Sequence, residues 1–217
     1  MKKLLFSILF IFTSFLVSAQ EEPKKKESFA DEFNREIKSI GKLNYKDYPM
    51  TLGVSGGVYF PTSVSYGLSD GAVGGGAALK YKFNFNRFFA ISTDLGYTYV
   101  KGQEQDYFKY TTISNMFDIK IMGIIQYERK KDETGFVPWF GTGPVISFAQ
   151  SKTIQHYSRQ DVVFDYNGAY FGYVAALGLK YNFKKAYAGV NLDYTITAPG
   201  GVDLSGFRIY AEAGYRF

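Results

Sequence analysis

Alternation of apolar and polar residues, in segments about ten residues long, constrains the fold of this chain more than any other feature. In the last segment the odd positions from Phe207 to Phe217 are all apolar, whereas the even positions include Arg208, Glu212 and Arg216. A period of two residues places alternate side chains on opposite faces of a β-strand. Eight segments are therefore expected to be strands: residues 52–60, 73–83, 89–99, 117–127, 140–148, 171–183, 186–196 and 207–217.

The connections between these segments alternate in length. Short polar connections occupy residues 84–87, 130–135 and 184–185, and longer ones occupy residues 61–72, 101–112, 151–168 and 197–205. Outer-membrane barrels have short turns on the periplasmic side and long loops outside. The pattern predicts an all-β fold, an eight-stranded antiparallel transmembrane barrel with extracellular loops and both termini in the periplasm. A soluble sandwich or lipocalin-like barrel is the alternative.

The positions of the aromatic residues favour the transmembrane barrel. Four strands end with a tyrosine on the apolar face, close to a short turn or to the C-terminus: Tyr81, Tyr127, Tyr181 and Tyr215. A second aromatic level follows eight to ten residues away, at Phe117, Tyr173 and Phe207. That spacing climbs roughly 20 to 25 Å along tilted strands, which matches the apolar band between the aromatic girdles of an outer-membrane barrel.

The first 49 residues form two segments of different character. Lys2 and Lys3 precede an apolar run and a small-residue site that ends at Ala19, so residues 1–19 are expected to be a signal peptide. In residues 20–49, apolar positions from Phe29 to Ile40 recur at helical spacing behind Ser28. This predicts a short amphipathic periplasmic helix that ends near Gly41, ahead of a barrel over residues 50–217.

Composition excludes several classes of protein and site. A mean hydropathy of −0.14 argues against a helical membrane protein. The absence of cysteine removes disulfides, zinc-cysteine sites and thiol nucleophiles. The formal net charge of +5 falls further once the two lysines of the signal peptide are removed, which is too mild to suggest nucleic acid.

Strand number, loop asymmetry and the C-terminal strand together resemble the small eight-stranded outer-membrane barrels of Gram-negative envelopes. This family includes the OmpA and OmpX type and the PorT-like outer-membrane barrel domain, and the resemblance covers about residues 50–217. The terminal aromatics Tyr215 and Phe217 are similar to the signal that the barrel-assembly machinery recognises in that family. The resemblance therefore implies two partners, the assembly machinery and outer-membrane lipid.

The inward face carries six basic and five acidic residues in a lumen just wide enough for its own side chains. They are therefore expected to pair and to plug the barrel. The middle and upper levels hold Asp94, Asp118, Lys120, Asp193, Arg208 and Glu212. We expect Lys120 and Arg208 to form ion pairs with acids at this level.

Basic residues dominate the periplasmic end of the lumen. Near the short turns lie Lys80, Lys82, Lys180 and Arg216, with only Glu128 to balance them. This arrangement predicts a basic mouth. The acids of the N-terminal segment are hypothesised to contact that mouth, with a solvated rim as the simpler alternative: Asp31, Glu32 and Glu36.

Signals for catalysis are poor. The only histidine, His156, lies near Ser158 in the third long connection, with Asp161 and Asp165 as the nearest acids. Some outer-membrane enzymes that act on lipid A are eight-stranded barrels, so a lipid-modifying enzyme is an alternative, although a solvated loop histidine is the default. The two aspartates do not make a metal site, and the glycine run 74–76 lacks the lysine of a phosphate-binding loop.

The sequence predicts a non-catalytic integral outer-membrane protein. It would act as a structural, envelope or surface interaction protein through its loops and N-terminal segment, and a small porin-like channel is a further alternative. The aromatic third connection is the expected contact surface for a surface or periplasmic protein: Tyr157, Phe164 and Tyr166. No cofactor, metal or nucleic acid is expected.

Overall fold

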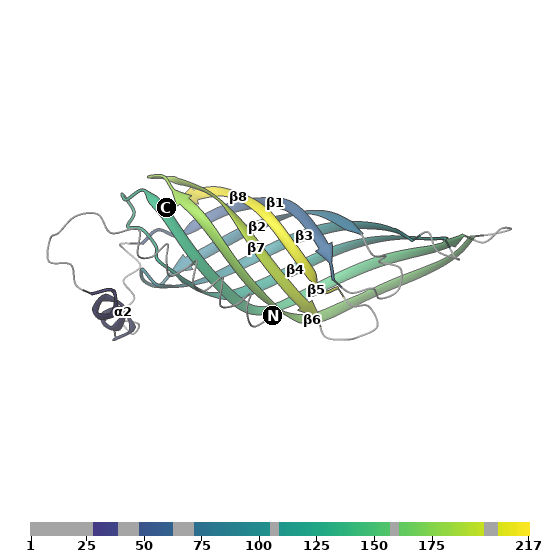
Figure 1. Ribbon diagram of the computed structural model, residues 1–217, viewed down its shortest axis with the longest axis horizontal. Helices are drawn as coiled ribbons and strands as arrows, with labels where there is room; N and C mark the ends of the chain where they lie inside the picture. Colours follow the sequence, from purple (N-terminus) through teal and green to yellow (C-terminus); the bar gives the residue numbers. More distant parts are fainter. Residues whose placement is uncertain (1–27, 39–47, 63–71, 105–108, 157–160, 198–203) are drawn as a thin grey trace. The chain divides into compact units, whose positions relative to one another are not determined.

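The protein is an eight-stranded antiparallel barrel in a computed structural model that describes residues 28–38, 48–62, 72–104, 109–156, 161–197 and 204–217. Each strand pairs with the next, and the last pairs with the first (Figure 1). The strands are β1 (Thr51–Pro61), β2 (Val73–Asn84), β3 (Phe89–Glu104), β4 (Lys109–Gln126), β5 (Gly135–His156), β6 (Asp161–Asn182), β7 (Ala186–Thr197) and β8 (Gly206–Arg216).

The barrel closes between β1 and β8. Their antiparallel register runs from Thr51 opposite Arg216 to Pro61 opposite Gly206. Beyond it, the amide of Met50 donates to the carbonyl of Phe217 and the amide of Phe217 donates back, both at 3.0 Å. Closure pairs the backbone groups of both edge strands, which is the condition for a sheet to stand in hydrocarbon.

The apolar face of the barrel points outward. Val54, Val190 and Ile209 are 62%, 58% and 51% exposed, whereas Asp118 and Arg208 on the inner face are each 1% exposed. This distribution is the reverse of that in a soluble protein, where large apolar side chains are the most often buried. It shows the transmembrane type of barrel and excludes the lipocalin-like alternative, whose apolar face points inward.

The N-terminal helix belongs to a separate compact unit, residues 1–41, and the barrel belongs to the unit that begins at residue 42. The helix α2 (Phe29–Lys38) begins directly after Ser28, whose side-chain oxygen accepts a 3.3 Å hydrogen bond from the amide of Ala30. The rings of Phe29 and Phe33 stack along one side of the helix. In the described part of the chain, no helix has the length and apolar character needed to span a membrane.

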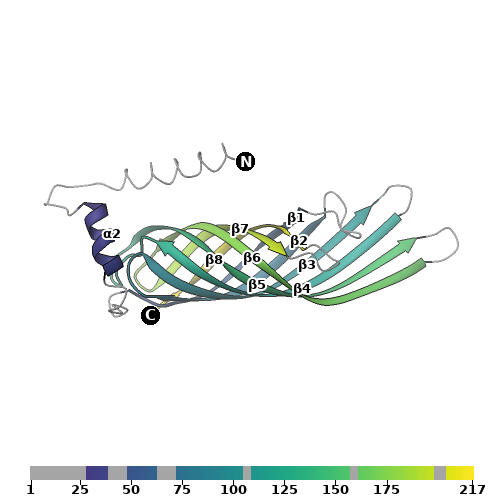
Figure 2. The same cartoon turned by 90° about the horizontal axis from the view of Figure 1, so that it is seen from below.

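Two of the expected long loops are wrong. Most of residues 101–112 and 151–168 belongs to strands, because β3 and β4 form a hairpin and β5 and β6 pair from Gly135–Asn182 up to His156–Asp161. Figure 2 shows both hairpins extending past the neighbouring strands at one end of the barrel. The strand alternation continues past the membrane level there, but charged and amide side chains replace the outward apolar ones and disguise it.

A charge on the outward face of β7 tests this orientation. Val190 lies near the middle of β7 on the apolar face. We expect Val190→Arg to lower the free energy of unfolding in phospholipid vesicles by about 2 to 4 kcal/mol, because it places a guanidinium in hydrocarbon. Val190→Leu is the matched control, and denaturant titration measures both. Equal stability of the two variants would contradict the outward orientation.

Candidate functional site

The lumen is filled by ionised side chains that belong to distant strands. At its centre, Arg208 on β8 lies 2.6 Å from Asp118 on β4 and 3.8 Å from Asp193 on β7. Lys120 on β4 donates to Asp193 at 2.5 Å. Ser147 donates a further 2.6 Å hydrogen bond to Asp118. Both cations expected at this level therefore have an acid partner across the barrel.

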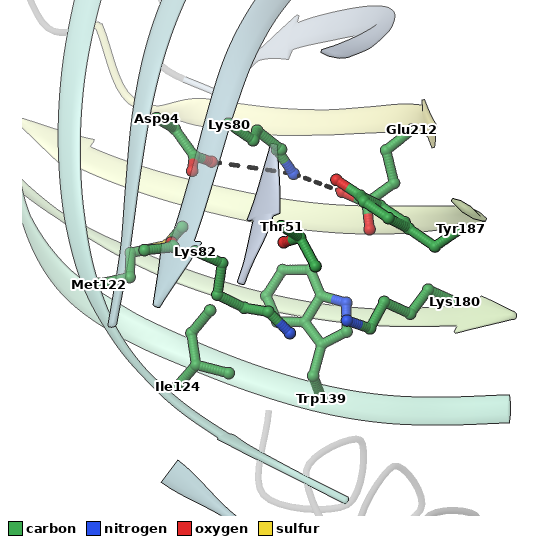
Figure 3. Close-up of a pocket in the computed structure, with 11 residues that line it drawn as sticks. Thr51, Lys80, Lys82, Asp94, Met122, Ile124, Trp139, Lys180, Tyr187 and Glu212 are labelled. Carbon is green, nitrogen blue, oxygen red and sulfur yellow. Dashed lines mark hydrogen bonds and ion pairs between the residues drawn. The ribbon is translucent and has the colours of Figure 1, made fainter. Parts of the chain in front are cut away.

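Lys80 belongs to this central cluster and not to the periplasmic mouth. Its ammonium group lies 2.8 Å from Glu212 and 3.8 Å from Asp94, and Asn191 donates to the same oxygen of Glu212. A lysine stem is long enough to carry its charge well above the level of its own backbone. Figure 3 shows the ammonium group between the two carboxylates. Its assignment to the mouth, based on distance from the turn alone, was wrong.

A second ionic cluster closes the periplasmic end around one carboxylate. Glu128, just past β4, accepts from Lys82 at 2.7 Å and from Lys180 at 2.8 Å on the same oxygen. Its other oxygen accepts from Asn182 and from the amide of Arg129. Glu128 is fully buried, and each of the two lysines is less than a tenth exposed.

The electrostatics of this cluster follow from those contacts. Burial by itself would raise the pKa of Glu128, but the ammonium groups of Lys180 and Lys82 outweigh it and hold the pKa below its ordinary value. Lys82 also donates to Gln126 at 2.6 Å, and Gln126 donates to Asn84 at 2.7 Å. Asn84 in turn donates to the carbonyl of Pro49, which ties the segment before β1 to the end of the barrel.

Arg216 forms hydrogen bonds with two turns of the chain. Its guanidinium donates to carbonyl oxygens in the turn between β4 and β5 and in the turn between β6 and β7: Arg129, Lys130, Glu133, Phe183 and Lys184. With Lys82 and Lys180 bound to Glu128, these contacts give a partner to three of the four basic residues assigned to the predicted basic mouth. Turn carbonyls partner Arg216, and the carboxylate of Glu128 partners the two lysines. Contact with Asp31, Glu32 and Glu36 remains a prediction.

A cavity of about 30 Å³ separates the two ionic clusters. Lys80, Asp94 and Glu212 line one part of it, and Lys82 and Lys180 line another, beside the only tryptophan, Trp139 (Figure 3). That volume is on the scale of one water molecule. Gly178 makes room for the indole, because a Cβ there would lie 2.5 Å from Trp139 Nε1. The cavity is too small for a solute pathway.

Apolar side chains fill the other end of the lumen. The buried cluster comprises Tyr59, Ala72, Val100, Met116, Ala149, Tyr170 and Leu204. Tyr59 donates to the carbonyl of Leu204 at 2.8 Å, and its ring lies 4.9 Å from the guanidinium carbon of Arg208. Tyr166, expected in the contact loop, packs against this cluster, whereas Phe164 is exposed. Tyr157 lies outside the described residues.

The expected girdle tyrosines lie at the end of the barrel that carries the short turns. Tyr81, Tyr181 and Tyr215 alternate with the inward residues Lys82, Lys180 and Arg216, and are therefore on the outer face. Tyr127 lies one residue past β4, between the guanidinium groups of Arg87 and Arg129. Tyr215 and Phe217, the expected assembly signal, are both exposed, with nearly parallel rings.

His156 ends β5 and contacts both neighbouring strands. Its Nδ1 lies 2.9 Å from Asp161 on β6, and its Nε2 lies 3.3 Å from the hydroxyl of Thr111 on β4. The order hydroxyl, imidazole, carboxylate is that of a nucleophilic triad, but the contact between His156 and Asp161 is open to solvent, with side chains 39% and 55% exposed. Ser158 lies outside the described residues. In the described parts of the chain, no group of three or more potential ligands gathers to hold a metal.

The comparisons with known proteins agree with this architecture. No protein-family model and no curated protein matches the sequence. The structure is similar to that of the outer membrane protein OprG from Pseudomonas aeruginosa, with a TM-score of 0.58 and 12% identity over 79% of this chain and 97% of OprG. It is also similar to Ail, the attachment invasion locus protein of Yersinia pestis, in complex with the heparin analogue sucrose octasulfate, with a TM-score of 0.50 and 12% identity over 79% of this chain and 99% of Ail. The chain therefore has the fold of the small outer-membrane β-barrels.

Replacing the carboxylate that joins Lys82 and Lys180 tests the periplasmic cluster. We expect Glu128→Gln to lower the free energy of unfolding by about 3 to 5 kcal/mol, because it leaves two buried ammonium groups without their acid. Glu133→Gln, at a half-buried residue, removes a 3.6 Å contact with Arg87 and is the matched control, which should cost about 1 kcal/mol or less. Denaturant unfolding followed by Trp139 fluorescence measures both.

The stability difference between the wild type and Glu128→Gln has a defined pH dependence. A carboxylate whose pKa is lowered by folding stabilises the folded state fully above its unfolded pKa, about 4.3 for glutamate. That contribution is lost only as the pH falls through the lower folded value. The stability difference between the wild type and Glu128→Gln should thus be present in full at about pH 5 and shrink only as the pH falls below about 4. Equal stability of the two proteins at about pH 5 would contradict the ionic account.

Proposed function

We propose that this protein is a non-catalytic integral outer-membrane barrel that acts outside its lumen, as a surface or envelope interaction protein. The observation that carries the proposal is the contrast between the two parts of the barrel. The lumen is filled by paired charges and an apolar cluster, whereas the β3–β4 and β5–β6 hairpins extend past the other strands with apolar residues exposed. A closed lumen leaves the hairpins and the N-terminal segment as the surfaces free to contact a partner.

The orientation in the envelope follows from the same contrast. The short turns belong at the periplasmic side with both termini, and the extended hairpins belong outside the cell. Val163 and Phe164 of β6 point to opposite sides of the sheet, yet they are 46% and 41% exposed. The extended part of the β5–β6 hairpin therefore exposes both of its faces to a partner. Tyr215 and Phe217 would serve the barrel-assembly machinery during insertion.

The fold is compatible with surface attachment. Ail, whose fold this chain shares, is named for attachment and invasion, and its structure holds a sulfated sugar analogue. An identity of 12% transfers no ligand, so this likeness supports the class of function only. Apart from the exposed Thr111–His156–Asp161 contacts, the described residues offer no arrangement that favours the lipid-modifying alternative.

Channel recording separates the proposal from the porin-like alternative. We expect the purified barrel to give no steady conductance in a planar lipid bilayer, because the ionic clusters and the apolar cluster around Tyr59 fill the lumen. A general porin inserted into the same bilayer is the positive control. Stable single-channel steps would contradict the closed lumen, provided that the protein migrates faster on a gel unheated than boiled, as a folded barrel does.

Site-specific photo-crosslinking tests the contact surface in the native envelope. A photoreactive residue at Phe164 should give discrete crosslinked protein bands, because this side chain lies on the exposed hairpin. The same residue at Val190 is the matched control and should label lipid alone, since Val190 lies on the outer face of the barrel wall. Lipid-only labelling at both positions would overturn the interaction proposal.

A further inference from the structure

Three layers of chemically different side chains follow one another up the outward face of β3–β6. The lowest is the aromatic row, Tyr97, Phe117 and Phe148, whose members are directly opposite one another in the sheet. Two residues farther along β4 and β5 is the amide row, Asn115 and Gln150 with Asn167 opposite on β6, and Tyr99 lies at the same level on β3. Two residues farther again is the lysine row, which runs from Lys101 on β3 past Ile113 on β4 to Lys152 on β5 and Asp165 on β6.

The aromatic row marks the upper edge of the membrane level. Phe117 stands ten residues from Tyr127 of the periplasmic girdle, which corresponds to a climb of roughly 25 Å along a tilted strand. Each further pair of residues adds about 5 Å. The amide row is thus at the depth of lipid head groups and the lysine row at their outer surface, since the head-group region on each side is about 5 to 8 Å thick.

The amide row is available for a ligand. The hydroxyl of Tyr97 donates to Asn115 Oδ1 at 2.6 Å, which occupies the carbonyl of that amide and leaves its NH₂ group to donate outward. Gln150 and Asn167 are exposed and have no side-chain partner within the described residues. A hollow of about 570 Å³ in the outer face of the sheet is lined by members of both the aromatic and the amide rows.

The lysine row carries a net positive charge, because its two lysines share the row with a single acid, Asp165. Lys101 and Lys152 are exposed, and neither forms an ion pair with any residue that the structure describes. Asp165 faces Lys152 in the register of β5 and β6 without closing an ion pair. The two lysines lie on strands separated by β4, so their backbones are about 10 Å apart. That separation is close to the length of a disaccharide.

We propose that this face binds a phosphorylated glycolipid of the outer leaflet, a disaccharide that carries acyl chains below and a phosphate at each end. The acyl chains would contact Phe117 and Phe148, the amide row would bond the sugar hydroxyls and acyl amides, and Lys101 and Lys152 would each pair with one phosphate. Phosphatidylglycerol has one phosphate and no sugar at the amide level, so it fits the upper two layers less well. The inference rests on the proposed outer-membrane location and adds a ligand class and a site to it.

Lipid titrations with matched lysine variants test the inference. The full mature chain, folded in detergent micelles, is titrated with diphosphoryl lipid A, with dephosphorylated lipid A and with phosphatidylglycerol, and native mass spectrometry measures the bound lipid. We expect Lys101→Gln with Lys152→Gln to weaken diphosphoryl lipid A binding about thirty-fold, at roughly five-fold for each lysine. The control, Lys184→Gln with Lys185→Gln, removes two exposed lysines at the opposite end and should leave the affinity unchanged.

Each other outcome overturns the proposal. Equal losses in the two double variants would show attraction by net charge alone, and no loss in the first would remove the lysine row from the site. Wild-type affinity for phosphatidylglycerol equal to that for diphosphoryl lipid A would exclude a glycolipid site. The proposed outer-membrane location is tested separately. It fails only if unheated wild-type protein does not migrate faster on a gel than boiled protein, or if a photoreactive residue at Val190 labels no lipid.

Discussion

Pairing of β1 with β8 is the constraint on which the rest of the structure depends. An unpaired NH or C=O group in hydrocarbon costs several kcal/mol, so eleven residue pairs at this seam remove a penalty that no side chain could offset. Closure with eight strands then fixes the lumen at a width that side chains can fill. It also forces alternate residues to face lipid or lumen. The outward Val190 and the inward Arg208 are two results of that one division.

Charges in the lumen specify the register more than they add stability. Buried ion pairs are often no better than well-packed apolar residues, because desolvation offsets the attraction between the charges. In a membrane barrel, however, a slip of one residue would turn Arg208, Glu212 and Arg216 toward lipid and bring apolar side chains inward. Paired charges therefore penalise the wrong register strongly and are tolerated in the right one. Lys80 and Lys82 illustrate the pairing, since they occupy successive inward positions on β2 and pair with different acids.

The sequence was sufficient for features that depend on the two-residue period of a strand. It was insufficient for features that depend on how far a long side chain extends. Alternation predicted the barrel and placed Lys120 and Arg208 in the lumen. It could not tell that the stem of Lys80 carries its charge up to Glu212, or that Arg216 turns to the carbonyls of two turns. The extended hairpins were missed for another reason. Lys152 and Asp165 are typical loop residues in composition, and only the pairing of β5 with β6 shows that they belong to strands.

Extension of only β3–β6 raises a question of stability, because an isolated two-stranded hairpin is marginal in water. The structure answers it by continuing the β4–β5 pairing to Lys109 and His156, so that the two hairpins form one four-stranded sheet above the barrel. His156 then bridges the top of that sheet, with Asp161 on one side and Thr111 on the other. Its contacts with both neighbours account for its position without catalysis. A sheet held in this way presents a fixed outer face, and fixed spacing between side chains is what recognition of a rigid ligand requires.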